Sequence, residues 1–222
     1  MLPGFIKVIT MRNSNSFVDE LIGGIDRSLK TLTGGYSATR PSPAASQQEP
    51  ELSDQERKHV AGLMRVNHAG EICAQALYEG QALTAKSASA KASLLHAAGE
   101  EQDHLSWCRQ RLEQLDARPS VFDPLFYGAS FALGVGAGLL GDRVSLGFVE
   151  ATEDQVVKHL EEHLATLPEQ DEKSRVILEE MRADESRHGA NALAQGASVF
   201  PQPLKNMMSL VSKAMTQTTY RI

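Results

Sequence analysis

The spacing of apolar residues predicts helices along almost the whole chain. Apolar positions recur every three or four residues, which is the repeat of one helix face, and no stretch alternates apolar and polar residues as strands in hairpins do. We therefore expect an all-α protein. The predicted helices cover residues 17–32, 53–84, 88–116, 122–141, 143–167, 170–199 and 203–216. Four of them are long enough to form a four-helix bundle.

Start and stop signals divide the chain into two parts. Ser53 and Glu56 have the spacing of a capping box, which marks a helix start, and prolines follow three of the predicted helices. Residues 33–52 are rich in Gly, Pro, Ser and Gln, which is typical of a flexible linker. We expect an N-terminal amphipathic helix and linker over residues 1–52, and the bundle over residues 53–222.

Composition narrows the class of protein. The chain has 222 residues and a net charge of -6, so it lacks the basic balance of a nucleic-acid binder. Its two cysteines, without CxxC spacing, indicate a reducing compartment and no disulfide framework or zinc ribbon. The N-terminal apolar patch is short and is interrupted by Lys7, so it does not fit a secretory signal peptide. We therefore expect a cytoplasmic protein. Either Met1 or Met11 could be the start.

Each of the four long helices carries one glutamate inside its apolar stripe. In the range 88–116, the residues that step by four and three are Leu94, Ala98, Glu101, Leu105, Cys108, Leu112 and Leu115. The same test places Glu71, Glu153 and Glu185 on the core faces of the other three helices. A lone carboxylate in a bundle core costs several kcal/mol, so four that converge need cations to compensate them.

Two of these glutamates begin a Glu-x-x-His pair, which adds imidazole to the donor set. Residues three apart share a helix face, so both members of a pair can reach one centre. The predicted ligands are Glu71, Glu101, His104, Glu153, Glu185 and His188. This is the ligand set of ferritin-like di-iron and di-manganese bundles. Oxygen-rich sites with one imidazole per metal favour iron or manganese over zinc or copper.

Two further acids are weighed against this set. Glu56 and His59 form a third Glu-x-x-His, but the capping box and the helix dipole already explain Glu56. Glu150 competes with Glu153, but its row of the helix is more polar. We therefore leave Glu56 and Glu150 out of the ligand set.

Other polar residues near the ligands have more ordinary interpretations. We interpret His68 as an outer hydrogen-bond partner or a capping group, and His96 and His163 as surface or packing residues. Glu100 and Asp103 flank Glu101 in a highly charged stretch, and we expect both of them to face water.

An apolar segment joins the two predicted metal-binding hairpins. Residues 125–141 are seventeen uncharged residues, fewer than the about 20 that a membrane-spanning helix needs. The segment fits either a helix that dips into one leaflet or a buried core helix. In the first case it would line a channel for a lipid-soluble substrate. The candidate channel residues are Phe126, Phe131, Leu133, Leu139 and Leu140.

Five blocks of sequence resemble the Coq7-type demethoxyubiquinone hydroxylases. They are "MRVNHAGEICAQALYEGQ", "EEQDHLSW", "FALGVGAGLLGDR", "VEATEDQVVKHL" and "ADESRHGANAL", in the order of the family and across about residues 55 to 215. The resemblance implies a ferritin-like, membrane-associated, non-haem di-iron monooxygenase. It would use O2 to hydroxylate the ring of polyprenylated 3-demethoxyubiquinol in ubiquinone biosynthesis.

The resemblance also implies roles for particular residues. The family's ligands fall on the six residues named above, with two iron ions per chain, and Glu101 and Glu185 are expected to bridge them. His159 is implied as an outer partner or an electron relay. Leu160 stands where relatives can carry Tyr, which puts a Tyr-dependent relay in doubt.

Location and partners follow from the same resemblance. We expect peripheral association with the cytoplasmic face of a bacterial inner membrane and contact with other ubiquinone-biosynthesis proteins. The sequence does not decide the oligomeric state. The alternatives are a ferritin-like protein that oxidises and stores iron, a metal-free membrane adaptor, and another ferritin-like hydroxylase with a soluble or tRNA substrate.

Overall fold

The computed structural model describes residues 17–222, and this part of the chain is helical without strands. The predictions that concern Met1, Lys7 and Met11 lie outside the described residues. The helices are α1 Phe17–Thr33, α2 Asp54–Thr84, α3 Ala88–Gln114, α4 Asp123–Leu139, α5 Asp142–Thr166, α6 Glu172–Ala194 and α7 Gln202–Thr219. The all-α class is confirmed, and each predicted helix has a counterpart.

The helix ends follow local chemistry. The predicted capping box is present, because the Ser53 side chain accepts a hydrogen bond from the Glu56 backbone while the Glu56 carboxylate accepts one from the Ser53 backbone. The predicted helix over residues 170–199 extends five residues beyond the C-terminal end of α6 in the structure. Gly196 takes a φ of 89°, and the Ala197 amide turns back to the Ala192 carbonyl, which ends α6 at Ala194.

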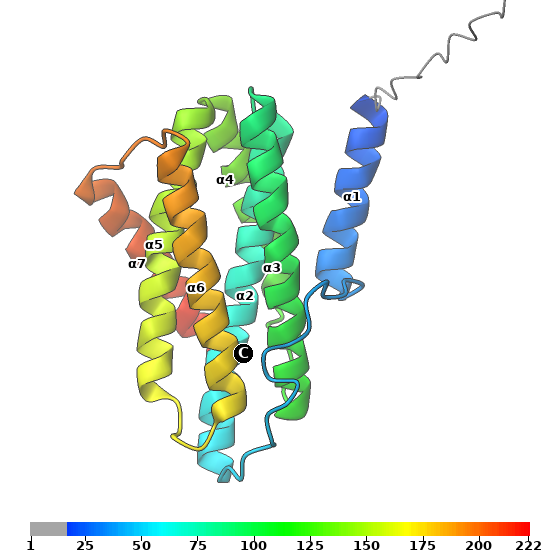
Figure 1. Ribbon diagram of the computed structural model, residues 1–222, viewed down its shortest axis with the longest axis vertical. Coiled ribbons are helices and arrows are strands. Elements are labelled where there is room, and N and C mark those ends of the chain that lie inside the picture. Colours follow the sequence, from blue (N-terminus) through cyan, green and yellow to red (C-terminus); the bar gives the residue numbers. More distant parts are fainter. Residues whose placement is uncertain (1–16) are drawn as a thin grey trace, which may run out of the picture.

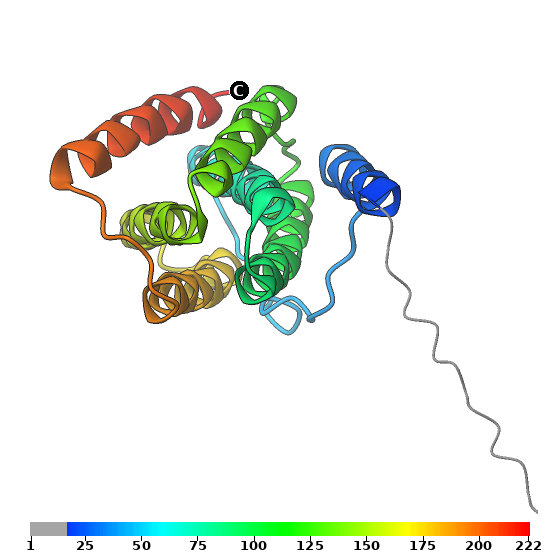
Figure 2. The ribbon, with the colours of Figure 1, turned by 90° about the horizontal axis from the view of Figure 1, so that it is seen from above.

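Four helices form the bundle that positions the candidate site. In Figure 1, α2, α3, α5 and α6 run side by side, and Figure 2 shows the same four around a common centre. α2 and α3 form one hairpin pair, and α5 and α6 form the other. The glutamate-bearing stripe of each helix therefore faces the middle of the bundle.

α4 packs on the outside of α2 through glycines. A side-chain carbon added at Gly134 would overlap the Leu77 carbonyl oxygen, and one added at Gly80 would overlap the Phe131 carbonyl oxygen. The two backbones are therefore in direct contact. α4 is therefore not a fully buried core helix, because one of its faces packs against α2 and the other is exposed.

The contact between α4 and α2 predicts a sharp difference between two glycines of one helix. Gly134→Ala should lower the free energy of unfolding by about 1–3 kcal/mol, because the new methyl group must push two backbones apart. Gly136→Ala is the matched control, since nothing lies within 4 Å of a carbon added there. It should be neutral or raise stability by up to about 1 kcal/mol. Thermal unfolding of both variants tests this, and equal effects would contradict the packing described.

The outer faces of α4 and α7 are apolar. Leu133, Leu139 and Leu140 are 57%, 64% and 73% exposed, and on α7 Leu210 and Val211 are 70% and 66% exposed. Figure 2 shows α4 and α7 along the same side of the bundle, away from α6 and the start of α3. Within residues 17–222, no helix has the length and apolar character needed to cross a membrane.

Candidate metal centre

The four stripe glutamates lie in the middle of the bundle. Glu71 projects from α2, Glu101 from α3, Glu153 from α5 and Glu185 from α6, and each is at most 2% exposed. His104 and His188, one turn after Glu101 and Glu185, are buried beside them. The structure thus brings together all six residues that the sequence singled out.

The six residues form two ligand groups that share two members. Glu71, Glu101, His104 and Glu185 make one group, and Glu101, Glu153, Glu185 and His188 make the other. Within each group, the ligand atoms lie within 4.8 Å of one another. Glu101 and Glu185 belong to both groups, so their carboxylates lie where the two groups meet, and each group could hold a metal ion.

Both imidazoles direct Nδ1 toward the carboxylates. His104 Nδ1 lies 3.2 Å from Glu101 Oε2 and 3.1 Å from Glu185 Oε1. His188 Nδ1 lies 2.9 Å from Glu185 Oε2 and 3.2 Å from Glu101 Oε1. Each ring therefore offers one nitrogen to the centre and keeps the other, Nε2, for a different partner.

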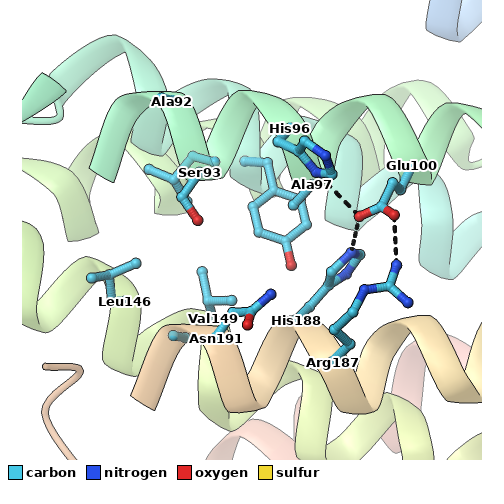
Figure 3. A pocket seen from close by; sticks show the side chains of 13 residues that line it. Ala92, Ser93, His96, Ala97, Glu100, Leu146, Val149, Arg187, His188 and Asn191 are labelled. Atoms are coloured by element: carbon cyan, nitrogen blue, oxygen red, sulfur yellow. Dashed lines mark hydrogen bonds and ion pairs between the residues drawn. The ribbon is translucent and has the colours of Figure 1, made fainter. Parts of the chain in front are cut away.

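The outer nitrogen of each imidazole contacts an acid from the opposite helix. His104 Nε2 lies 3.0 Å from Asp184 Oδ2, and His188 Nε2 lies 2.8 Å from Glu100 Oε2. Arg187 joins the two acids, because it lies 2.7 Å from Asp184 and 2.5 Å from Glu100. Figure 3 shows its contact with Glu100. A carboxylate that accepts the Nε2 proton fixes the ring and leaves Nδ1 free to bind metal.

The expectation that Glu100 and Asp103 face water was wrong. Asp103 is 1% exposed, and the Glu100 carboxylate, at the edge of the site, contacts His188 and Arg187. A repeated pattern in the sequence could have revealed part of this. In "EEQDH" and "DESRH" an acid directly precedes the ligand glutamate, and these two acids, Glu100 and Asp184, are the partners of the histidines.

The burial of these carboxylates and their closeness to one another fit a centre that holds cations. Burial raises the pKa of Glu71 and of Glu153 well above the usual range, and the neighbouring carboxylates raise both further. Burial lowers the pKa of His188, but the nearby carboxylates of Glu101 and Glu185 outweigh it and raise that pKa to about 12. Without metal, protons therefore offset the carboxylate charge at the places where cations would bind.

The donor set passes a second test for metal. Glu101 Oε1 and Glu185 Oε1 are buried without a hydrogen-bond partner, although an imidazole nitrogen lies near each. Buried carboxylate oxygens normally find donors. Carboxylate oxygens without a donor on the two shared glutamates fit residues that would hold a cation.

Tyr78 lies at the site, although the sequence analysis did not select it as a site residue. It is on the same face of α2 as Glu71. It is 1% exposed, and its hydroxyl donates a short hydrogen bond to Glu153 Oε1. Burial raises the pKa of this phenol well above its usual value, and the Glu153 charge raises it further, so it remains a donor. Tyr78 thus orients the one ligand glutamate that lacks a contact with an imidazole nitrogen.

The other histidines lie outside both ligand groups. His68 is buried, with Nδ1 at 3.2 Å from Asp123 and Nε2 at 3.1 Å from the Tyr36 hydroxyl. His159 packs against His163, with tilted rings whose centroids are 4.0 Å apart, about two turns along α5 from Glu153. His163 packs in the core, where its Nδ1 lies 2.9 Å from Asn67 Oδ1. His96 is exposed, as expected, near Glu100.

A pocket of about 350 Å³ borders the centre between α3 and α6. Figure 3 shows Leu146 and Val149 on one side and His96, Glu100 and Arg187 on the other, with His188 pointing toward Glu100. The pocket reaches the centre at His188 and Tyr78. The proposed channel residues lie elsewhere: Phe126 and Phe131 are half-buried on α4, and Leu133, Leu139 and Leu140 are on its exposed face.

Comparisons with known proteins agree with this geometry. The family model described as "Ubiquinone biosynthesis protein COQ7" matches residues 57–219. A 3-demethoxyubiquinol 3-hydroxylase of Ectopseudomonas mendocina is 58% identical over 206 residues, 92% of this chain and 96% of that protein. The proteins of the same name from Pseudomonas aeruginosa and Pseudomonas fluorescens are 56% identical over 207 residues and 55% identical over 215 residues. They cover 92% and 96% of this chain, and 96% and 100% of their own lengths. A family match over most of the chain, together with this identity, shows that the chain belongs to the COQ7 family.

Proposed function

We propose that this protein hydroxylates the ring of a polyprenylated 3-demethoxyubiquinol with O2, as a step of ubiquinone biosynthesis. The relatives that carry the name of this hydroxylase span nearly the whole chain. The observation that carries the proposal is the pair of ligand groups that share Glu101 and Glu185. Four carboxylates and two imidazoles suit iron, which is the metal of non-haem oxygen chemistry.

The proposed cofactor is two iron ions in a ferritin-like bundle. Glu71 and His104 would hold one ion and Glu153 and His188 the other. When bound, iron supplies the redox chemistry that activates O2. A ferritin-like cage that stores iron is the weaker alternative, because the relatives with this chain's sequence carry the name of a hydroxylase.

The residues of the chain prepare the centre for this chemistry. Asp184 and Glu100 accept the Nε2 protons of the two histidines, which keeps each Nδ1 available. Tyr78 holds Glu153 in place. Leu105 and Met181, both 0% exposed, lie one turn from Glu101 and Glu185 and help to keep water out of the centre.

A direct assay tests the reaction. Protein reconstituted with Fe²⁺ and supplied with a two-electron reductant such as NADH should convert a short-chain 3-demethoxyubiquinol to the hydroxylated quinol. Mass spectrometry should find one oxygen atom of ¹⁸O2 in the product, while the other atom leaves as water. Cells that lack the protein should accumulate demethoxyubiquinone. Product without ¹⁸O, or normal ubiquinone in such cells with no other hydroxylase present, would contradict the proposal.

The apolar outer faces of α4 and α7 support peripheral membrane association. A polyprenyl substrate resides in a bilayer, and the two helices that carry the exposed leucines, α4 and α7, lie along one side of the bundle. An amphipathic surface of this kind binds at the interface without crossing the bilayer. For a bacterial protein, the inner membrane's cytoplasmic face is the expected location.

If α4 and α7 contact the membrane, a lysine on their exposed faces should weaken membrane binding, whereas a lysine elsewhere on the surface should not. Leu133→Lys with Leu210→Lys should weaken binding to vesicles of phosphatidylethanolamine and phosphatidylglycerol by more than about tenfold, since each buried leucine is worth about 1.5–3 kcal/mol. Leu95→Lys is the control, because Leu95 is 39% exposed on α3 instead. Vesicle flotation measures both. Equal binding by the double variant and the wild type would rule out this surface as the membrane contact.

A further inference from the structure

The segment between α1 and α2 is an ordered strap, although its composition predicts a flexible linker. We use "strap" for residues 36–49, which Figure 1 shows beside the lower half of α3. Ala44 is buried within the bundle's main core cluster. At its far end, Glu49 accepts hydrogen bonds from Arg111 on α3 and Lys173 on α6, at 2.7 and 2.8 Å. The strap therefore crosses the seam between these two helices.

Arg40, in the middle of the strap, joins buried acids from α3 and α6. Its Nε lies 2.8 Å from Asp103 Oδ2, and its Nη2 lies 2.6 Å from Asp184 Oδ2. Both carboxylate side chains are only 2% exposed. The guanidinium also lies over the Trp107 ring, 4.9 Å from its centroid. A planar fork held by two acids and an aromatic face has little freedom to move.

A single residue, Asp184, connects Arg40 to the predicted metal ligand His104. Asp184 Oδ2, which accepts from Arg40, is the same oxygen that faces His104 Nε2. Trp107 adds a second connection, because its ring lies 5.4 Å from the His104 ring. The position of the His104 ring is thus set by groups that Arg40 holds on both sides.

The group that contains Glu153 and His188, the second half of the centre, is not covered by the strap. Its outer acid, Glu100, is held by Arg187 of α6 and borders the pocket of about 350 Å³ between α3 and α6. No residue of the strap lines this pocket. The two halves share the same ligand pattern but differ in what covers them.

We propose that Arg40 is a positioning residue that holds His104 through Asp184, and that the strap makes the two halves of the metal centre unequal. The half with Glu71 and His104 is closed by the strap. The half with Glu153 and His188 borders the pocket and is the exchangeable one. This inference rests on the proposed function, because it assumes that the chain binds two ions.

Titration of the metal-free protein with Co²⁺ tests the proposal without turnover. Visible absorption reports the coordination of bound Co²⁺, and wild type should bind two ions. In Arg40→Ala, one of the two ions should bind about 10- to 100-fold more weakly, which is the usual cost of losing an outer partner. Its absorption band should change while the band of the other ion stays as in wild type. Arg40→Lys keeps the positive charge but loses the planar guanidinium that contacts both acids, so its affinity for that ion should lie between those of Arg40→Ala and wild type.

Glu49→Gln provides the matched control. It loosens the strap at the Arg111 and Lys173 end but leaves every group that contacts His104 in place, so its titration should match wild type. If Arg40→Ala fails to fold by circular dichroism, Arg40→Lys decides alone. Wild-type titration curves for the folded Arg40 variants, or equal weakening of both ions, would overturn the inference. Fewer than two ions in wild type would instead contradict the proposed function.

Discussion

Replacing Glu185 with Gln should remove most of the metal and abolish hydroxylation. Glu185 belongs to both ligand groups, so its loss affects both ions at once. The amide keeps the shape of the side chain but has no negative charge and only one oxygen to offer. We expect metal content after anaerobic reconstitution to fall from two ions per chain to below one. Turnover should fall by more than the roughly 100-fold that loss of an outer partner costs.

Glu179→Gln is the matched control for this experiment. Glu179 lies on the same helix and is exposed to water, so its substitution makes the same chemical change away from the centre. It should leave metal content and turnover unchanged. Metal analysis by mass spectrometry, together with the quinol assay, measures both variants. A Glu185→Gln protein with two ions and normal turnover would refute the assignment of the centre.

The sequence located the six clustered residues because the burial of a residue follows the period of its helix in a bundle. The stripe that contains Leu94, Leu105 and Leu112 faces the core, so Glu101, in step with them, faces it too. The same reasoning separated Glu153 from Glu150. In the structure Glu153 joins a ligand group, while Glu150 lies 3.0 Å from Lys205 of α7.

The groups outside the stripes could not be found in this way. Asp103, Asp184 and Arg187 lie on helix faces next to the stripe, where charged residues usually meet water. What covers those faces is a neighbouring helix or the strap, and the period of one helix carries no information about its neighbours. Arg40 is the clearest case, because its partners follow it by 63 and 144 residues.

Metal binding should release protons, and the affinity for metal should rise with pH. Without metal, burial raises the pKa of Glu71 and Glu153, and nearby carboxylates raise both further. Burial lowers the pKa of His104, but hydrogen bonds to Asp184, Glu101 and Glu185 outweigh it and raise that pKa well above its usual value. Each of these groups therefore keeps its proton to a higher pH than the free side chain does, and the His188 imidazole, with its pKa raised to about 12, is protonated at neutral pH. A metal ion binds only the deprotonated forms, so it must displace these protons.

The sign of the effect follows from these raised pKa values. Groups with raised pKa values stabilise the metal-free fold at low pH, and this stabilisation is lost as pH rises through their folded pKa values. Metal competes with the same protons, so each proton displaced should strengthen apparent binding about tenfold per pH unit. Calorimetric titration with Co²⁺, in buffers of different ionisation enthalpy, should show between one and two protons released per ion. Binding that is independent of pH and releases no protons would mean that the ions are held by other residues, because this cluster cannot bind metal while it remains protonated.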